Sequence, residues 1–310
     1  SDKVVPTRWH YEAKTDLRGE MIKAKARDVV QGFRQTKDTD YKEVFAPTIR
    51  GEQVRLLLAV ATKHFGLLRK EARLYLRNAK LLQMKLADVL GKGDVKDAYL
   101  QSPLPEDEQI LFELPLGYEP KLKAPPGFKV VGRALKALPG MKQAGRTWYV
   151  HQRHILRDMG FTPCTAAPCI YVKETDTGIL VIGHFVDDLI MLNLTRNPHA
   201  FDSVKEALSG NYEVKYAGTL DKFLGAEFEE REDGLRLHLT NYIDNITKKY
   251  LEEGTKPVMT PEFTAEMSAA EAALLQRADI KMYQEITGAL MFAMTTAHPD
   301  ISHAVNKLAR

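Results

Sequence analysis

Hydrophobic and polar positions follow two periods along the 310 residues, and each predicts one kind of element. Apolar residues recur at helical spacing in 51–65, 143–159 and 281–296, so we expect helices there. Short alternating stretches around the turn signal "KTDLRGE" predict a β-hairpin within 4–34. Weaker patterns predict helices near 67–90, 199–209, 240–252 and 269–277, a strand that ends at Pro103, and strands near 108–119, 171–172 and 222–239.

One apolar run, from Ile179 to Leu192, contains two adjacent acids, Asp187 and Asp188. An unpaired buried carboxylate is unfavourable, and two neighbouring ones also repel each other. A strand, Asp-Asp, strand arrangement avoids both costs, because a hairpin tip exposes the acids while its flanks stay buried. The simplest alternative is an ordinary solvated turn.

The central segment alternates strand, helix, two strands, helix and strand, which is typical of a ferredoxin-like antiparallel sheet with helices on one face. A third acid, Asp94, begins another central strand candidate, "GDVKDAYL". If the two strands are neighbours, Asp94 meets Asp187 and Asp188. Carboxylate oxygens suit Mg²⁺, and two such ions about 3.5–4 Å apart promote phosphoryl transfer.

Composition narrows the class of protein. The net charge of +3 hides an asymmetry, because residues 1–100 hold 21 Lys and Arg against 13 Asp and Glu, a balance of +8, which leaves −5 for the rest. A basic first third suits a polyanionic partner or a solvated face.

Cys164 and Cys169 are too few for a disulfide framework and lack zinc spacing, so we expect free thiols in a reducing compartment. We find no membrane-spanning run, and the start at Ser1 suggests excision from a longer chain.

Nine stretches in order resemble one family nearly end to end. They are "VPTRWHYEAK", "KAKARDVVQGFRQTKDTDYKEVFAPT", "LLLAVATKH", "DVKDAYLQSPL", "ALKALPGMKQAGRTWY", "GFTPCTAAPCIYV", "FVDDLIML", "KFLGAEF" and "YQEITGALMFAMTTAHPDISHAVNKLAR". The chain is similar to the reverse transcriptase of copia-type LTR retrotransposons, without the RNase H domain. The resemblance implies an α+β right-hand polymerase fold. It implies fingers at 1–93 with a basic helical insert at about 67–92, a palm at 94–225, and a primer grip, thumb and start of the connection at 226–310.

The resemblance also implies the roles of individual residues. Asp94, Asp187 and Asp188 would be catalytic, and with Val95 they would hold two Mg²⁺ ions, with Mn²⁺ as an alternative. Tyr99 would lie under the sugar of the incoming nucleotide, although a core aromatic is its alternative role. The other expected nucleotide contacts are Lys25, Arg27, Lys96, Asp97, Ala98, Lys142 and Gln143. The expected primer and template contacts are Phe223, Leu224, Gly225, Lys248 and Lys249.

Several positions have structural alternatives. Lys25, Arg27, Lys248 and Lys249 would otherwise be solvated surface residues. We expect Trp9 and Trp148 to be core anchors, and His184 to be a core histidine rather than a ligand.

The sequence departs from the family pattern near the first aspartate. An extra "KLADVLGKG" separates Gln83-Met84 from Asp94, and Asp88 inside it offers a rival alignment. "DVKDAYL" continues as the family does after Asp94, which favours Asp94. Other departures are "LPG" for Leu-Tyr-Gly, "AGR" for Ala-Pro-Arg, Ala167 for aspartate, Phe185 for tyrosine and His298 for arginine.

The resemblance implies RNA- and DNA-directed DNA synthesis. The partners would be a primed RNA or DNA template and dNTPs, with no membrane, and either a homodimer or other products of the polyprotein. The expected location is a cytoplasmic virus-like particle, with the nucleus as an alternative. Two rival functions stay open: a domesticated, non-catalytic relic that binds nucleic acid or scaffolds a particle, and another palm-fold phosphotransferase such as a nucleotide cyclase.

Overall fold

The computed structural model describes residues 3–15, 21–75, 84–218, 220–231, 234–256, 258 and 277–309. The chain divides into two compact units, one of residues 1–57 and 63–219, the other of residues 58–62 and 220–310. The predicted boundary between fingers and palm at residue 93 lies inside the first unit and stays a prediction.

A six-stranded sheet forms the centre of the first unit, in the order β11-β4-β10-β9-β8-β7 with every neighbouring pair antiparallel. Strands β11, β4, β10 and β9, with α4 between β4 and β9 and α5 between β10 and β11, have the predicted ferredoxin-like arrangement, although its last strand is β11 and not a strand near 222–239. The strands are β4 (Leu90–Val95), β7 (Thr162–Cys164), β8 (Ala167–Thr175), β9 (Gly178–Phe185), β10 (Asp188–Thr195) and β11 (Val214–Ala217).

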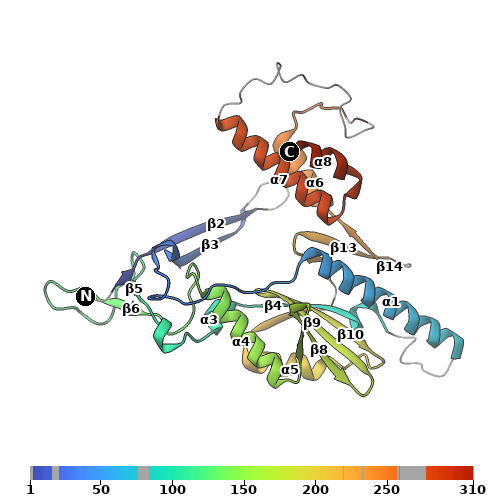
Figure 1. The fold of residues 1–310 in the computed structure, drawn as a ribbon, viewed down its shortest axis with the longest axis horizontal. Helices are drawn as coiled ribbons and strands as arrows, with labels where there is room; N and C mark the ends of the chain where they lie inside the picture. Colours follow the sequence, from blue (N-terminus) through green and yellow to red (C-terminus); the bar gives the residue numbers. More distant parts are fainter. Residues whose placement is uncertain are drawn as a thin grey trace. The chain divides into compact units, whose positions relative to one another are not determined.

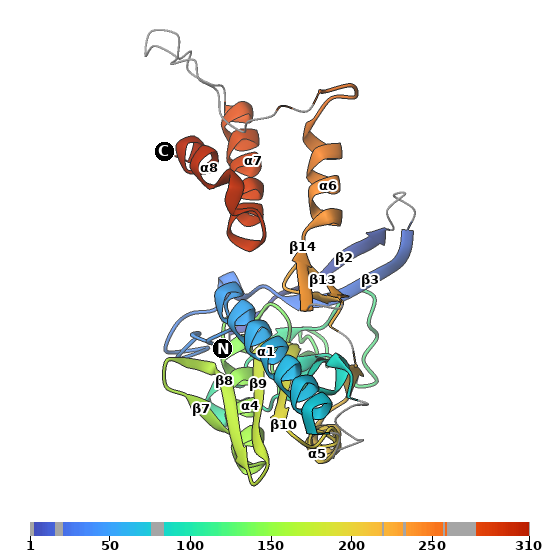
Figure 2. The ribbon, with the colours of Figure 1, turned by 90° about the vertical axis from the view of Figure 1, so that its right-hand side faces the viewer.

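Helices cover both faces of this sheet (Figures 1 and 2). On one face, α4 (Ala144–Asp158) and α5 (Asp202–Asn211) share a core with Leu189 and Met191 of β10. On the other face lies α1 (Gly51–Tyr75), where a Cβ added to Gly183 would lie 3.4 Å from Cδ1 of Leu57. Burial on both faces explains why β9 and β10 are continuously apolar instead of alternating.

The N-terminal part of the first unit adds two smaller sheets and a second core. β1 (Val4–Val5), β5 (Leu111–Glu113) and β6 (Val131–Arg133) form one sheet, and β2 (Thr7–Thr15) pairs with β3 (Met21–Val30) in the predicted hairpin. Short helical turns connect these elements: η1 (Gly32–Arg34), η2 (Leu86–Asp88), α3 (Ala98–Gln101) and η3 (Glu106–Glu108). The second core contains Val5, Val30, Leu104, Ile110, Ala134, Ala137, Met141 and Ala144.

The two tryptophans differ in environment. Trp148 of α4 is 1% exposed, as predicted for a core anchor. Trp9 of β2 is 38% exposed and stacks on Tyr11 at 6.2 Å between ring centroids, so its prediction as a core anchor is wrong. Its indole Nε1 donates to the backbone oxygen of Leu116 at 3.0 Å. A two-stranded hairpin has no second layer to cover the ring.

The helix predicted over 67–90 is correct only in part. α1 continues without a break from Gly51 to Tyr75, whereas Leu90–Val95 is strand β4. The strand predicted to follow this helix is confirmed from Lys92 to Val95, where β4 pairs with β10 and β11 on its two edges. Residues 76–83, with Arg77 and Lys80, lie outside the described residues, as does nearly all of the helix predicted at 269–277.

The second unit joins a small sheet to helices. β12 (Lys222–Phe223), β13 (Ala226–Arg231) and β14 (Gly234–His238) form a three-stranded antiparallel sheet. On α7, Phe292 meets the ring of Tyr242 from α6 at 4.8 Å between centroids, and Ala289 accepts a hydrogen bond from the Tyr242 hydroxyl at 3.0 Å. The helical elements are α6 (Thr240–Tyr250), α7 (Arg277–Thr296), η4 (Pro299–Ile301) and α8 (Ser302–Leu308).

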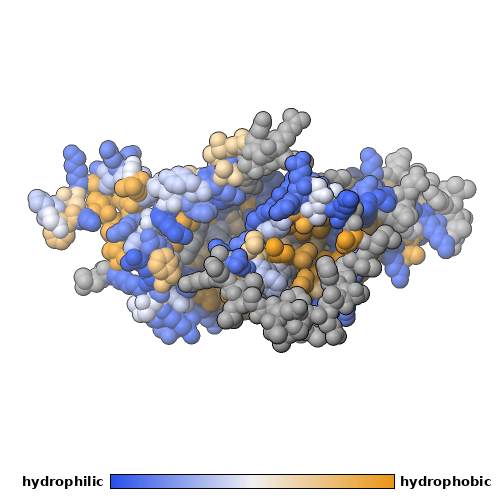
Figure 3. All heavy atoms as spheres, turned by 90° about the horizontal axis from the view of Figure 1, so that it is seen from above, coloured by the Kyte–Doolittle hydropathy of each residue, from blue (hydrophilic) through white to orange (hydrophobic). Residues whose placement is uncertain are grey.

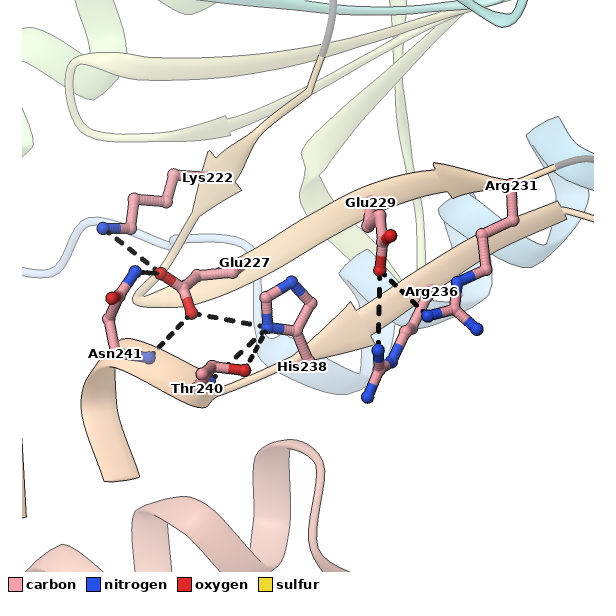
Figure 4. A network of polar contacts seen from close by, with 8 residues as sticks. All are labelled: Lys222, Glu227, Glu229, Arg231, Arg236, His238, Thr240 and Asn241. Carbon is pink, nitrogen blue, oxygen red and sulfur yellow. Dashed lines mark hydrogen bonds and ion pairs between the residues drawn. The ribbon is translucent and has the colours of Figure 1, made fainter. Parts of the chain in front are cut away.

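A buried carboxylate joins this sheet to α6, as Figure 4 shows. Glu227 of β13 accepts hydrogen bonds from the backbone N–H of Asn241 at 3.0 Å and from the Asn241 side chain, and lies 3.5 Å from the Lys222 ammonium. The residue that precedes α6, Leu239, offers no side-chain cap. Glu227 therefore satisfies an amide in the first turn of α6 from another element and fixes where the helix leaves the sheet.

The surface is mixed. Figure 3 shows hydrophobic atoms among a largely hydrophilic face, and exposed apolar side chains such as Leu116, Leu122 and Phe128 belong to connecting segments. Cys164 is exposed and Cys169 is buried, and both thiols are free as predicted. Among the described helices, none is long and apolar enough to cross a membrane.

A close backbone crossing generates the first prediction. Gly140 has φ +89°, and a Cβ there would lie 2.2 Å from the backbone oxygen of Val30, which cannot move aside as a side chain can. Gly140→Ala should therefore lower the free energy of unfolding by at least roughly 1–3 kcal/mol, the cost of the backbone strain alone. Gly66→Ala is the control, because Gly66 lies within α1 with no neighbour that its Cβ would meet; it should stabilise by about 0.5–1 kcal/mol.

Denaturant unfolding of both variants checks this prediction. A Gly140→Ala protein as stable as its parent would show that the crossing opens without cost.

Candidate active site

Three aspartates gather where two neighbouring strands of the central sheet end. Asp94 on β4 lies directly opposite Asp188 on β10 in the antiparallel register, so their side chains leave the same face. Asp187 lies at the tip of the β9–β10 hairpin, and its backbone oxygen accepts a hydrogen bond from the N–H of Val95 at 2.8 Å. The predicted hairpin with acids at its tip is confirmed, and so is the pairing of the two strands.

We call residues Phe185 to Asp188 the acidic turn. It connects β9 to β10 through two residues, and the first of them, Val186, has φ +54°. A left-handed conformation is strained for a β-branched residue. The Val186 backbone oxygen accepts a hydrogen bond from the indole Nε1 of Trp148 at 2.6 Å. The acidic turn is thus held from α4 as well as from β4.

The electrostatics at the acidic turn reflect crowded negative charge. Desolvation raises the pKa of Asp187, and the carboxylates of Asp188 and Asp94 raise it further, while Lys92 opposes them. The Lys92 ammonium lies 3.1 Å from the Asp188 carboxylate, and both side chains are partly buried. Lys92 precedes Asp94 by two residues on β4, so it shares the face of the acids.

The oxygen donors at the acidic turn have the chemistry that Mg²⁺ prefers. They are not assembled for an ion, because no group of three or more His, Cys, Asp or Glu side chains among the described residues is arranged to hold a metal. The Lys92 ion pair accounts for part of this, since it occupies the Asp188 carboxylate. The side chain of Val95 lies in the core, so only its backbone oxygen could serve as a ligand.

The rival aspartate in the insert has a structural role. Asp88 ends η2, where its carboxylate accepts the backbone N–H of Lys85 at 2.7 Å. Its backbone oxygen accepts the side chain of Asn193, which lies five residues beyond Asp188 on β10. The register therefore places Asp94, and not Asp88, beside the acidic turn.

The segment after Asp94 turns as the resemblance requires. β4 ends at Val95, Asp97 has φ +48°, and α3 begins at Ala98, so a strand to Pro103 does not form. This turn brings Tyr99 close to the acidic turn: burial and then the charge of Asp187 raise the pKa of its phenol. Tyr99 is half-buried and packs against both cores of the first unit.

The amides of residues 95–99 are only partly available for phosphates. Val95 donates its N–H to Asp187, and Lys96 donates its N–H to the backbone oxygen of Glu213 at 3.0 Å. The side chain of Lys96 also pairs with the Glu213 carboxylate at 2.8 Å. These two amides therefore already have acceptors within the protein. The amides of Asp97, Ala98 and Tyr99 begin α3 and have no acceptor within the helix.

The remaining predicted nucleotide contacts lie on two elements. Lys25 and Arg27 alternate on β3, so they share one face of the hairpin, where Arg27 pairs with Glu12 at 3.1 Å. Lys142 is exposed. Gln143 is fully buried and accepts a hydrogen bond from Gln35 at 3.0 Å, so a direct contact with a nucleotide is wrong for this residue.

The predicted primer and template residues lie in the second unit. Leu224 and Gly225 form the tight turn from β12 to β13, both with positive φ, and Phe223 before them is buried. Lys248 on α6 is exposed, whereas Lys249 pairs with Glu285 of α7 at 3.3 Å.

Two residues that contact the acidic turn, Lys92 and Trp148, were not predicted from the sequence to belong to the site. Lys92 could have been found from its spacing of two residues before Asp94 on a predicted strand. Trp148 was placed correctly in the core, but no pattern in the sequence shows which backbone oxygen its indole N–H binds.

Comparison with known proteins defines the class of this chain. The pattern of the reverse transcriptase (RNA-dependent DNA polymerase) family matches residues 1–69 and 77–264. The match covers most of the chain, including the acidic turn, Asp94 and Tyr99. The chain belongs to this reverse transcriptase family.

Relatives in plants and yeast point to the copia-type branch. The chain is 27% identical over 311 residues to the retrovirus-related Pol polyprotein from transposon TNT 1-94 of Nicotiana tabacum, covering 98% of the chain and 21% of that protein. It is 30% identical over 308 residues to the Pol polyprotein from transposon RE1 of Arabidopsis thaliana, covering 99% and 19%. It is 30% identical over 218 residues to the putative transposon Ty5-1 protein of Saccharomyces cerevisiae, covering 70% and 68%. The chain thus corresponds to a copia-type reverse transcriptase region and spans about a fifth of the length of the plant polyproteins.

His184, three residues before Asp187, generates a prediction about stability. It is buried as predicted, between the rings of Tyr149 and Tyr171 at 5.8 Å from each, and burial lowers its pKa from 6.5 to about 4. Between these pH values the unfolded chain binds a proton that the folded chain does not. Stability should therefore be retained above pH 6.5 and fall as the pH decreases toward 4, by up to about 3 kcal/mol.

The comparison is denaturant unfolding of the parent and of His184→Phe across pH 4 to 7.5. The variant keeps an aromatic ring between the two tyrosines and should lack this part of the pH dependence. Parallel pH profiles for the two proteins would refute the assignment.

Proposed function

We propose that the chain is the polymerase part of a retrotransposon reverse transcriptase, an RNA-directed and DNA-directed DNA polymerase that extends a primer with dNTPs. One observation carries the proposal: Asp94 and Asp188 pair across neighbouring strands with Asp187 at the adjoining tip, on a ferredoxin-like sheet. In this arrangement the first unit supplies fingers and palm, and the second supplies the primer grip and thumb.

Asp94 and Asp187 are the main carboxylates of this proposal, with Asp188 in support. Bound Mg²⁺ would supply positive charge at the primer 3′-hydroxyl and at the triphosphate. The chain's own part is to hold the carboxylates on strands fixed by backbone hydrogen bonds, so that little reorganisation accompanies the reaction. The Lys92 ammonium balances the charge of Asp188 until the cations bind.

The nucleotide would lie between the acidic turn and the β2–β3 hairpin. Lys25 and Arg27 share one face of β3, so both cations can meet the same triphosphate. The amides of Asp97 to Tyr99 are the ones available at the start of α3. Tyr99 is close enough to Asp187 for their charges to interact, which supports a place for its ring under the sugar.

Nucleic acid would be bound largely through phosphate contacts and duplex shape. The turn of Phe223 to Gly225 would grip the primer through its backbone, since Phe223 itself is buried. Lys248 is better suited to a phosphate contact than Lys249, because Lys249 already pairs with Glu285. We also propose assembly with other products of the polyprotein, or a homodimer, in a cytoplasmic particle.

A non-catalytic relic of the same fold is the second candidate. The observation in its favour is the Lys92–Asp188 ion pair at a site that an active enzyme needs for cations. The persistence of all three acids opposes it, because clustered carboxylates with no cation destabilise a fold. Burial raises the pKa of Asp187 most, and the charges of Asp188 and Asp94 raise it further.

Primer extension with Mg²⁺ separates the two functions. The parent should extend a primed RNA or DNA template. Asp187→Asn and Asp94→Asn should lose at least about a hundredfold in rate, the scale of removing one electrostatic group from an active site. Without metal, Asp187→Asn should melt at the same temperature as the parent or higher, because it relieves the repulsion from Asp188 and Asp94.

Asp88→Asn is the matched control, since it removes an acid on the same segment whose role is to cap η2. It should keep extension and lose some stability. Extension at the parental rate by Asp187→Asn would overturn the assignment, and absence of extension by the parent would favour the relic.

The position of Tyr99 generates a prediction about sugar selection. If its ring fills the space of a 2′-hydroxyl, bulk is required and the phenol oxygen is not. Tyr99→Phe should keep the preference for dNTPs, and Tyr99→Val should incorporate ribonucleotides. Single-nucleotide insertion of dNTP and rNTP by both variants is the measurement. Undiminished discrimination by Tyr99→Val would leave the ring with a packing role only.

A further inference from the structure

The acidic turn is held by two backbone hydrogen bonds, one on each of its central residues. The carbonyl of Val186 accepts from the indole Nε1 of Trp148 at 2.6 Å, and the carbonyl of Asp187 accepts from the N–H of Val95 at 2.8 Å. The second bond is part of the strand framework. The first comes from a side chain, so a single substitution can remove it.

Val186 needs this restraint because its backbone is strained. Its φ of +54° is a left-handed conformation that a β-branched side chain disfavours, at a cost of about 1–3 kcal/mol. Such a conformation persists only where its surroundings fix it. Freed from Trp148, the turn could relax by rotating the peptide group between Val186 and Asp187. That rotation would move the carboxylate of Asp187, which follows directly in the chain.

Trp148 is itself rigidly placed. Its ring is 1% exposed and meets the ring of Tyr212 edge-on at 5.5 Å between centroids. It lies on α4, whose N-cap Gln143 is buried and hydrogen-bonded to Gln35 and to the backbone oxygen of Asp40. A fixed helix therefore presents the indole N–H to the acidic turn, and the same helix is tied at its start to the segment that follows the β2–β3 hairpin.

We propose that Trp148 is a positioning residue for DNA synthesis: its N–H holds the strained Val186 peptide, so that the backbone keeps Asp187 beside Asp94 and Asp188, from where the carboxylates can move together around an ion. The inference rests on the proposed polymerase function and adds a residue to it. Losing one buried hydrogen bond of this kind should shift the equilibrium between the held and the relaxed acidic turn by a factor of about 5 to 30. The effect should appear in the dependence on Mg²⁺, because the hydrogen bond holds the peptide group next to Asp187, whose carboxylate would hold the ion.

Two substitutions at Trp148 separate the hydrogen bond from packing. Trp148→Phe removes the N–H and part of the ring. Incorporation of 3-benzothienylalanine at position 148 replaces the N–H by sulfur in a ring of the same shape, so the fold is preserved if Trp148→Phe is poorly stable. Trp9→Phe is the chemical control, because it removes the same kind of N–H to carbonyl bond from the exposed face of β2. Leu156→Val is the packing control, a change in the same core on α4 that removes no hydrogen bond to the acidic turn.

The experiment uses the full chain with a primed template and has two readouts. The first is the Mg²⁺ concentration for half-maximal single-nucleotide insertion, which should rise by about 5- to 30-fold in both Trp148 variants. The second is the rise in melting temperature on adding Mg²⁺ without nucleic acid, which should shrink in both. Binding of the primed template, measured by fluorescence anisotropy, should stay within about twofold of the parent, since phosphate contacts dominate it. The two controls should match the parent in both Mg²⁺ readouts, although Leu156→Val should melt earlier.

The outcomes distinguish the two proposals. If the benzothienylalanine protein matches the parent in both Mg²⁺ readouts, Trp148 is only a core residue and the inference is wrong. If Leu156→Val shifts the Mg²⁺ dependence as far as the Trp148 variants do, general loosening of the core explains the effect, and the inference is again wrong. If the parent shows neither insertion nor a Mg²⁺-dependent rise in melting temperature, the proposed function fails, and the role of Trp148 fails with it.

Discussion

The pairing of β4 with β10 is the constraint on which the candidate site depends. It sets Asp94 opposite Asp188, and the hydrogen bond from Val95 to Asp187 continues the ladder into the acidic turn. A register shifted by one residue would turn Asp94 toward the core and Gly93 toward the acids. The buried side chains oppose such a shift, because Leu189 packs against Gly93 and a Cβ there would lie 3.3 Å from Leu189 Cδ1. The apolar packing of the strands thus fixes the geometry of the charges.

The three aspartates can lie close together because two of them reach solvent at the surface of the hydrophobic core. Asp94 and Asp187 are exposed, while their neighbours Gly93, Val95 and Leu189 are buried. Lys92 offsets part of the repulsion through Asp188, yet the pKa of Asp187 stays raised. The fold therefore bears a local cost, which comes first from the burial of Asp187 and then from the repulsion of the neighbouring carboxylates. That cost distinguishes this group of acids from an ordinary solvated turn, where no neighbouring carboxylate would raise the pKa.

Much of the first unit could be predicted from the sequence because its signals are local. The apolar run with Asp187 and Asp188 predicted the β9–β10 hairpin, and the spacing of Trp148, Ile155 and Leu156 predicted α4. Failures occurred where distant partners decide the outcome. The strand predicted to end at Pro103 stops at Val95, where the N–H of Lys96 binds the distant Glu213, and Gln143 is buried because Gln35 and Asp40 reach it from a remote segment. The hydrogen bond of the Trp148 indole N–H could not be predicted for the same reason, since its acceptor lies 38 residues away in the sequence.

Around the three aspartates, hydrogen bonds hold the backbone of the acidic turn, while ion pairs hold the neighbouring basic side chains. Backbone bonds and the buried indole fix the acidic turn, whereas Lys92, Lys96 and Arg27 are held by ion pairs that solvent reaches. The exposed ion pairs of Lys96 and Arg27 contribute little and exchange partners readily, whereas the pair of Lys92 with Asp188 is partly buried. The backbone that leads into Asp187 is the part held by hydrogen bonds on two successive carbonyls. Preorganisation in this site is therefore concentrated at one peptide group, between Val186 and Asp187, where strain, a β4 amide and the Trp148 indole act together.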